Sequence, residues 1–277
     1  SLQDLDWKNV LQNDPHLQYR VDDSGSVWNG QPIVTETEDQ TLGGYPDFGH
    51  ILYADLGGDG HEEAVISLQS GGTAGVTAFL VYQEATAGPR LVATGSGYQL
   101  ALHLDNERLV VSSSLFKGWE PNCCPSAIQI VHYRLIDDAL TATATEIDPN
   151  PSAKPDTVRY FYVLLNAKKY DGAYQFFSPT FQAKNPSVGW IRGQQATIEV
   201  SADAQNANDG GVQVSLSAQD ATPDGGTVER HFQGRWYLIF STQSRQWLLD
   251  HADIHEMPAQ RQTPSAALTA FYGGPAQ

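Results

Sequence analysis

The 277-residue chain is acidic: it carries 32 Asp and Glu against 16 Lys and Arg, a formal net charge of -16. A surface of this sign repels phosphate backbones and anionic lipids, so no binding to nucleic acid is expected. Its 40% hydrophobic content can supply a core to each of two domains, so a folded chain is expected and disorder is not the default. No apolar run reaches the roughly 18 residues that span a bilayer, so we expect no membrane insertion.

Short elements separated by turn signals fill the first half of the sequence. A short helix is predicted over residues 4–12. Strands are predicted at 50–56, 64–69, 76–83, 90–94, 109–115, 128–135 and 140–147. Short strands divided by Gly, Asp and Pro are typical of an antiparallel sheet, so residues 1–148 are predicted to form a β-rich domain.

The stretch Asp55–Glu63, DLGGDGHEE, carries acidic side chains at alternating positions. Calcium binds six to eight oxygens, and Asp55, Asp59 and Glu63 would supply three side chains. Gly57 has no side-chain oxygen for the third position of such a loop, which leaves the set one ligand short. The alternative is a hairpin in which Asp side chains cap backbone amides and glycines take positive φ. The hairpin is favoured, with a weak calcium site as the alternative and no other cofactor expected.

Cys123 and Cys124 are the two cysteines of the chain and are adjacent. One pair of thiols cannot complete a tetrahedral zinc site, so no structural zinc is expected. Three states stay open: a vicinal disulfide, two buried or half-buried thiols, or a redox-active pair. Pro121 and Pro125 deny the segment regular backbone hydrogen bonds, so we expect a loop before the strand near Ile128.

The segment 147–156, IDPNPSAKPD, holds three prolines and is predicted to be a linker. The acidic excess lies before it, because residues 1–150 carry 21 Asp and Glu against 6 Lys and Arg, whereas residues 151–277 carry 11 against 10. This step in charge indicates two modules. The predicted domains are residues 1–148 and 155–256, followed by a flexible tail over 257–277.

The second half begins with a helical period. Apolar residues recur at i, i+3, i+4 and i+7, which predicts an amphipathic helix with Val158, Phe161, Tyr162 and Leu165 on its buried face. A second helix is predicted over 170–177, and four strands at 196–206, 211–219, 227–241 and 246–254. Helices followed by a strand meander predict an α+β domain. The predicted fold class is therefore α+β: a β-rich antiparallel domain, then helices packed on a curved antiparallel sheet.

The segments YADLGGDGHEEAVI, GGTAG and GWEPNCCPSAIQIVHYR carry a family resemblance. Over about residues 25–146 the chain resembles the LppP/LprE lipoprotein family of exported bacterial proteins. The resemblance implies no biochemical activity. It implies a location: an exported protein that is periplasmic, at the cell surface or secreted.

The segments VRYFYVLLNAKKYDGAYQFFSPTFQ and WLLDHADI carry a second resemblance. Over about residues 155–254 the chain resembles the nuclear transport factor 2-like, or cystatin-like cone, superfamily, including its polyketide-cyclase-like branch. The resemblance implies a cone-shaped domain with a pocket between helices and sheet. It does not imply one function, because the superfamily includes isomerases, dehydratases, cyclases and non-catalytic binding proteins.

A pocket of this kind is predicted to be apolar and aromatic. Its candidate lining residues are Tyr160, Tyr162, Tyr174, Phe177, Trp190, Trp236 and Trp247. Asp250 on the last strand is the candidate base, because aromatic surroundings raise the pKa of a carboxylate by desolvation. The ordinary burial preference of aromatic side chains gives the alternative of a filled core.

Three functions are therefore considered. The first is an exported, non-catalytic cell-envelope protein that binds a small apolar or amphipathic ligand, since no pair of catalytic groups is evident. The second is an isomerase-, dehydratase- or cyclase-like enzyme that uses Asp250 in an aromatic pocket. In the third, the C-terminal domain serves only domain or subunit contacts. Neither the ligand nor the oligomeric state follows from the sequence.

Overall fold

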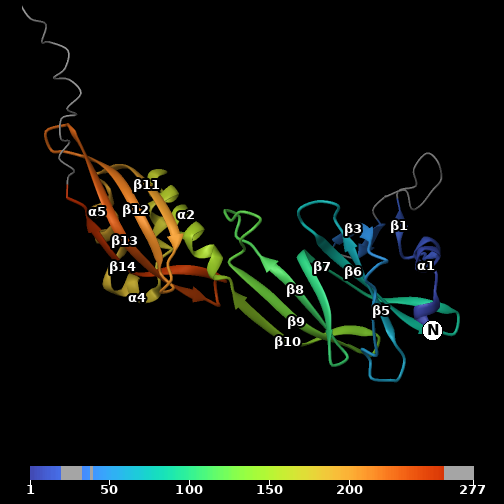
Figure 1. The fold of residues 1–277 in the computed structure, drawn as a ribbon. Coiled ribbons are helices and arrows are strands. Elements are labelled where there is room, and N and C mark those ends of the chain that lie inside the picture. The colour runs from blue at the N-terminus through green and yellow to red at the C-terminus, as the bar shows by residue number, and fades with distance from the viewer. Residues whose placement is uncertain (20–32, 38–39, 259–277) are drawn as a thin grey trace, which may run out of the picture. The chain divides into compact units, whose positions relative to one another are not determined.

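The structure, a computed structural model, describes residues 1–19, 33–37 and 40–258, and the chain divides into two compact units (Figure 1). Unit 1 comprises Ser1–Ala153 with Phe240–Gln246, and unit 2 comprises Lys154–Ile239 with Trp247–Gln277. The division after Ala153 lies inside the proline-rich segment 147–156. The predicted tail lies outside the described residues from position 259 onward.

The described residues of unit 1 form one short α-helix and an antiparallel sheet. A 3-10 turn (Leu2–Asp4) precedes α1 (Trp7–Asn13), and another (Pro151–Ala153) follows the last strand. The strands are β1 (Gln18–Tyr19), β2 (Ile33–Thr37), β3 (Gln40–Pro46), β4 (Leu52–Ala54), β5 (Glu63–Gln69), β6 (Val76–Ala85), β7 (Gly88–Asp105), β8 (Arg108–Leu115), β9 (Ala127–Ile136) and β10 (Ala139–Pro149). Their order is β1-β2-β3-β5-β6-β7-β8-β9-β10, and β4 pairs with β5.

The central strands of this sheet are buried on both faces. Successive side chains of a strand point to opposite faces, so a strand between two cores reads as a near-continuous apolar run. One core contains Trp7, Leu11, Ala64, Ile66, Leu68, Leu80 and Tyr82. The other contains Leu56, Val65, Phe79, Val81, Leu100, Leu109 and Leu135. Burial on both faces explains why β5 contains the nearly continuous apolar run AVISL.

Up to residue 258, where the described part of the chain ends, unit 2 contains four helices and a four-stranded antiparallel sheet. The helices are α2 (Lys154–Asn166), α3 (Tyr170–Tyr174), α4 (Pro179–Lys184) and α5 (Ser187–Gln194). The strands are β11 (Thr197–Asn206), β12 (Val212–Ala221), β13 (Thr227–Ser241) and β14 (Gln246–Glu256), in the order β11-β12-β13-β14. Pro155 and Asp156 lie in the first turn of α2, where a missing N–H costs nothing and a negative charge is favourable.

Helix α2 lies along the edge strand β11. Its predicted buried face is confirmed, because Val158, Phe161, Tyr162 and Leu165 are all buried. Asn166 at the end of α2 donates from Nδ2 to the carbonyl oxygen of Val200 at 2.7 Å and accepts from the Val200 amide at 2.8 Å. These bonds satisfy backbone groups at an edge that would otherwise stay open for pairing.

The predicted α+β fold class, with its cone-shaped helical layer, is wrong. About 50% of the structure is strand and about 19% is helix, so the chain is a β-rich fold with few helices. The prediction inferred a complete layer of helices from the helical period of residues 158–165. The helices that follow α2 have only five, six and eight residues, whereas the four strands of unit 2 have 10 to 15.

Within the described ranges, none of the helices combines the length and the hydrophobicity that a bilayer-spanning helix requires.

Candidate functional site

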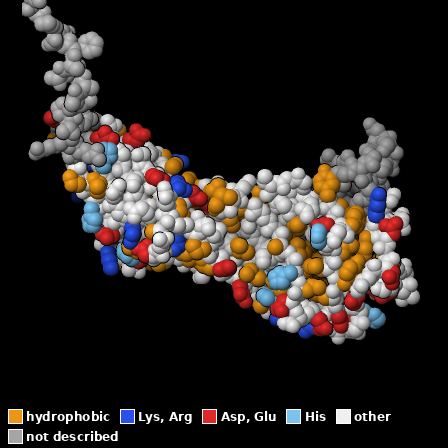
Figure 2. Space-filling model, in the orientation of Figure 1, with side chains coloured by type: hydrophobic (Ala, Val, Ile, Leu, Met, Phe, Trp, Pro, Cys, Tyr) orange, Lys and Arg blue, Asp and Glu red, His pale blue; other side chains and the backbone are white. Residues whose placement is uncertain are grey.

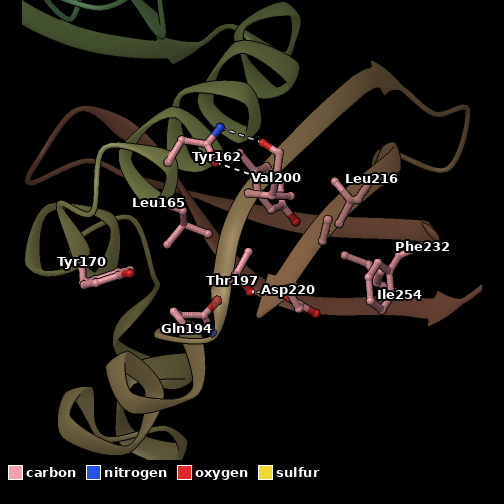
Figure 3. A pocket seen from close by; sticks show the side chains of 12 residues that line it. Tyr162, Leu165, Tyr170, Gln194, Thr197, Val200, Leu216, Asp220, Phe232 and Ile254 are labelled. Carbon is pink, nitrogen blue, oxygen red and sulfur yellow. Dashed lines mark hydrogen bonds between the residues drawn. The ribbon is translucent and has the colours of Figure 1, made fainter. Parts of the chain in front are cut away.

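A cavity of about 340 Å³ opens between the helices and the sheet of unit 2 (Figure 3). Residues from α2, the start of α3, the end of α5 and all four strands surround it. The lining residues are Tyr162, Leu165, Asn166, Tyr170, Gln194, Thr197, Val200, Leu216, Ala218, Asp220, Phe232 and Ile254. The alternation of β12 brings Leu216 and Ala218 to this face, because odd-numbered neighbours point the other way.

Burial divides the lining into a floor and a rim. The floor consists of the buried residues Tyr162, Leu165, Val200, Leu216 and Ala218. The rim consists of the exposed Asn166 and the partly buried residues Tyr170, Gln194, Thr197, Asp220, Phe232 and Ile254. The floor is therefore apolar apart from one phenol, and the polar side chains gather at the mouth.

Most polar groups of the cavity already have protein partners. The Tyr162 hydroxyl accepts a hydrogen bond from Trp236 Nε1 at 3.1 Å, and burial raises the pKa of Tyr162 to about 12 although this bond opposes the shift. At the rim, Thr197 Oγ1 donates to Asp220 Oδ1 at 2.8 Å. Arg230 Nε lies 3.6 Å from the other Asp220 oxygen. The phenol stays neutral at physiological pH, and the Asp220 carboxylate is held in place.

The seven predicted pocket aromatics lie mostly elsewhere. Tyr162 alone among them lines this cavity. Phe177, Trp190 and Trp236 belong to an aromatic cluster in which the Phe177 ring centroid lies 5.0 Å from that of Trp190 and 6.1 Å from that of Trp236. The rings thus fill the space that the sequence analysis assigned to a ligand, which agrees with the filled-core alternative.

The remaining aromatics lie at the borders of the cluster. Tyr174 packs against Phe177 with centroids 5.9 Å apart, and its hydroxyl donates to the Asn185 carbonyl at 2.9 Å. Tyr160 packs against Phe176 at 5.8 Å. Trp247 is buried with Lys154 Nζ 4.6 Å from its ring centroid. None of the three lines the cavity.

Asp250 does not line the cavity and does not have the raised pKa expected of a base. The Ser178 hydroxyl donates to its Oδ1 at 2.6 Å, and His251 Nδ1 lies 3.3 Å from its Oδ2. The hydrogen bond from Ser178 is the main cause that lowers the pKa of Asp250, with His251 adding to it against a smaller effect of burial. The carboxylate holds Ser178, which is the N-cap of α4.

The loop that follows β4 is held by two of the three carboxylates of the predicted calcium site, Asp55 and Glu63, while Asp59 Oδ1 accepts from the His61 amide at 2.9 Å. Asp55 Oδ1 accepts from the amides of Gly58 at 2.6 Å and Asp59 at 3.1 Å, and Oδ2 accepts from Gly60 at 2.9 Å. Burial would raise the pKa of Asp55, but these amides and the charge of Arg134 outweigh it and lower the pKa. Gly58 and Gly60 have φ of 74° and 88°. These contacts are those of the turn-capping alternative.

Glu63 caps the same loop from inside the core. It is fully buried, and its Oε2 accepts from the amides of Leu56 at 2.7 Å and Gly57 at 3.3 Å. Burial raises the pKa of Glu63, against the opposing effect of those amides. The nearby Gln83 side chain also lowers the pKa of Glu63, although the Oε1 atom of Glu63 has no hydrogen-bond partner of ordinary geometry. Five successive amides, 56 to 60, are thus held by the two carboxylates.

These contacts give a testable expectation for calcium. In residues 1–19, 33–37 and 40–258, no group of three or more His, Cys, Asp and Glu side chains is placed to hold a metal ion. Because the carboxylates of Asp55 and Glu63 already bind amides, we expect calcium at several millimolar to leave the melting temperature unchanged. A calcium-dependent rise that Asp59→Ala abolishes would establish the weak calcium site instead. Asp224→Ala, in an exposed turn of unit 2, is the matched control.

Cys123 and Cys124 form a disulfide in the loop between β8 and β9. Cys123 is exposed and Cys124 is half-buried. The loop is held by Glu120, whose Oε2 accepts from the amides of Lys117 at 2.7 Å and Ser126 at 3.1 Å. The pair lies in a loop before β9, as predicted, and it lines none of the cavities described here.

A second cavity, of about 360 Å³, lies in unit 1. It is lined by Leu52, Val65, Val76, Leu100 and Leu102, with Asp47 and His50 among its polar residues. Figure 2 shows hydrophobic side chains gathered on the visible face of this unit. Of its polar pair, the His50 side chain is 84% exposed, whereas the Asp47 side chain is 24% exposed. We therefore take the unit 2 cavity, with its buried floor, as the candidate site.

Sequence reasoning missed the rim of that cavity. Tyr170, Gln194, Thr197 and Asp220 come from four different elements, α3, α5, β11 and β12. None of them belongs to a sequence motif with a characteristic spacing. The position of Asp220 beside Thr197 follows only when the register between β11 and β12 is known.

No family model and no curated protein matches this chain. A solved structure of a mannose phosphorylase from Leishmania mexicana, in complex with a phosphate ion, is similar over 74% of this chain and 68% of that chain. The two sequences are 10% identical, and the TM-score is 0.22. A likeness this weak carries no argument about fold or function. The resemblances to the LppP/LprE and nuclear transport factor 2-like families stay predictions.

Proposed function

We propose that the chain is a non-catalytic binding protein and that the cavity of unit 2 holds a small apolar or amphipathic ligand. The observation that carries the proposal is the division of the cavity into a buried apolar floor and a polar rim. Ligand sites are typically concave, mostly apolar and furnished with a few polar groups that orient the ligand. A volume of about 340 Å³ lies near the lower end of the usual range, which favours a small ligand.

The chemistry of the lining favours binding over catalysis. A general acid or base works best when its pKa lies near the operating pH. The Tyr162 phenol, with a pKa of about 12, is far above that range. Asp250, the base of the alternative enzyme hypothesis, has a lowered pKa and lies outside the cavity. At the rim, Asp220 accepts from the Thr197 hydroxyl, and neither His nor Cys is among the lining residues that could act beside this pair.

We further propose that the protein is exported, to the periplasm, the cell surface or the medium. The family resemblance of the first half supports this location. The Cys123–Cys124 disulfide also supports it, because disulfides persist in oxidising compartments and are rare in the cytosol.

The binding proposal is tested by filling the floor. Ala218→Leu adds three carbon atoms where the wild-type side chain lines the cavity and is 7% exposed. We expect this variant to weaken binding of the neutral amphipathic dye N-phenyl-1-naphthylamine by about tenfold or more, as the loss of a few apolar contacts implies. Fluorescence titration measures the affinity of the dye.

Ala221→Leu is the matched control, because Ala221 lies in the same strand and is exposed outside the cavity. The control is expected to bind the dye as the wild type does. Equal affinities of the wild type and Ala218→Leu would contradict the proposal, as would the absence of binding by the wild type.

A further inference from the structure

The rim of the unit 2 cavity carries one ionised side chain. Of the twelve lining residues, Asp220 is the only one with a formal charge. Its carboxylate accepts one hydrogen bond from Thr197 and faces Arg230 at 3.6 Å. Each carboxylate oxygen has two lone-pair sites, so Asp220 keeps capacity to accept from a ligand.

The cations near the rim offset this charge only in part, and neither of them lines the cavity. Lys168 Nζ is bound to the carbonyl oxygens of Thr197 at 2.6 Å and Ile198 at 2.8 Å, and its side chain does not line the cavity. Arg230 also lies outside the lining set, and its side chain is 45% exposed. A ligand head group at the rim therefore meets a carboxylate first.

Two further polar groups face the same space. The Tyr170 side chain reaches from the start of α3 toward Thr197, and Gln194 approaches from the end of α5 (Figure 3). Neither the Tyr170 hydroxyl nor the Gln194 amide makes a hydrogen bond within the part of the chain that the structure describes. Both are available to a ligand, and the amide can donate as well as accept.

From this arrangement we propose that the rim selects the polar head of the ligand. The head is an uncharged or cationic hydrogen-bond donor, such as a hydroxyl, an amide or an ammonium group, and Asp220 is the residue that discriminates against carboxylates. The apolar body of the ligand lies on the floor formed by Leu165, Val200 and Leu216. This inference rests on the proposed function, because it assigns a ligand class to the same cavity.

The physical reason is electrostatic. An anionic head at the rim would lose its hydration beside the carboxylate of Asp220, which has the same sign of charge. No cation among the lining residues would compensate for that loss. A hydroxyl or ammonium head donates to Asp220 and exchanges its hydration for a charge-assisted bond. Tyr170 and Gln194 can complete the shell of either head.

The experiment uses four eight-carbon probes of similar shape: 1-octanol, octanamide, octylammonium and octanoate. Competition with N-phenyl-1-naphthylamine at neutral pH gives their affinities for the full chain. We expect the wild type to bind octylammonium and the two neutral probes at least about tenfold more tightly than octanoate. Asp220→Asn is expected to reduce the difference between octylammonium and octanoate to about threefold or less.

Two further variants separate the rim from the general acidity of the protein. Asp203→Asn removes an exposed carboxylate of β11 that does not line the cavity, and it is expected to leave the discrimination unchanged. Arg230→Gln removes the cation next to Asp220 and is expected to increase the discrimination. This variant keeps the test decisive if Asp220→Asn fails to fold, because Thr197 and Asp220 keep their bond.

The outcomes distinguish the two proposals. If octanoate binds the wild type as tightly as octylammonium, the head-group inference is overturned and the binding function stands. If Asp220→Asn retains the full discrimination, or Arg230→Gln does not increase it, the assignment to Asp220 is overturned. If neither the dye nor any probe binds, the proposed function itself fails.

Discussion

Replacing Phe177 by alanine is expected to lower the free energy of unfolding of unit 2 by about 3–5 kcal/mol, the usual cost of truncating a buried phenylalanine. The side chain is 2% exposed, so its removal leaves a cavity that the surrounding rings cannot close without moving. Ring neighbours of Phe177 are Phe161, Tyr174, Phe181, Trp190 and Trp236. Urea denaturation followed by tryptophan fluorescence measures the loss, since two of these neighbours are tryptophans.

The backbone around Phe177 adds to the expected effect. The Leu249 amide donates to the Phe176 carbonyl at 2.8 Å, and the Ser178 amide donates to the Leu249 carbonyl at 2.8 Å. The aromatic cluster thus fixes the segment that bonds to β14 and that places Ser178 on Asp250. Loss of the ring loosens the start of α4 as well as the core.

Phe181→Ala is the matched variant for this prediction. The Phe181 ring stacks on Phe177 with centroids 4.0 Å apart, but it is only half-buried. A smaller loss is therefore expected, because less apolar surface returns to water. If Phe177→Ala and Phe181→Ala lowered the free energy of unfolding equally, Phe177 would not be the ring on which the packing of the cluster mainly depends.

The sequence predicted elements well where one face of an element is buried. The period of residues 158–165 identified the buried face of α2 because those side chains all pack inward. Strands β11 to β14 were found within one or two residues at each end, because short polar turns separate them, two of which contain Asp and Gly. Helices α4 and α5 were missed, since they have no buried residues and so show no apolar period.

Strand β7 shows why glycine misleads a prediction from sequence. The predicted strand ended at residue 94, because Gly95 and Gly97 were taken as turn signals, yet β7 continues to Asp105. A Cβ at position 95 would collide with the ring of Phe79, and one at position 97 would collide with Leu100. The glycines there permit close packing inside a long strand, which a single sequence does not distinguish from a turn.

The candidate site was the least predictable part. Aromatic residues were assigned to the pocket that the resemblance to the cone superfamily implies, but their mutual packing fills the space they were expected to line. The cavity lies where smaller residues such as Val200, Leu216 and Ala218 face α2. Small apolar side chains on the same face leave a space that larger ones would fill. Which side chains share a face depends on strand register, and register cannot be predicted from this sequence before the strand pairing is known.

Replacing Glu63 by alanine is expected to lower the free energy of unfolding by about 2–4 kcal/mol, from the loss of bonds to a charged acceptor and the space left in the core. The amide of Gly57 would lose its Glu63 partner, and that of Leu56 would keep only the Ala54 carbonyl at 3.0 Å. Thermal and urea denaturation measure the effect. Glu62→Ala is the control, because Glu62 is exposed beside it and, among the residues that the structure describes, bonds only to the exposed Gln3 side chain.

Because the pKa of Glu63 is raised, the free energy of unfolding is expected to depend on pH, and the Glu63→Gln variant isolates this dependence. A carboxyl whose folded pKa lies above its unfolded value of 4.5 supports folding fully below that value, and the support is lost as the pH rises through the folded pKa. Glutamine keeps the shape and one acceptor but cannot ionise. The wild type should therefore lose stability relative to Glu63→Gln as the pH rises from below 4.5 toward neutrality. Comparing the two proteins cancels Asp55, whose lowered pKa acts in the opposite direction. A difference that stays constant across this range would mean that Glu63 ionises in the core as freely as in water.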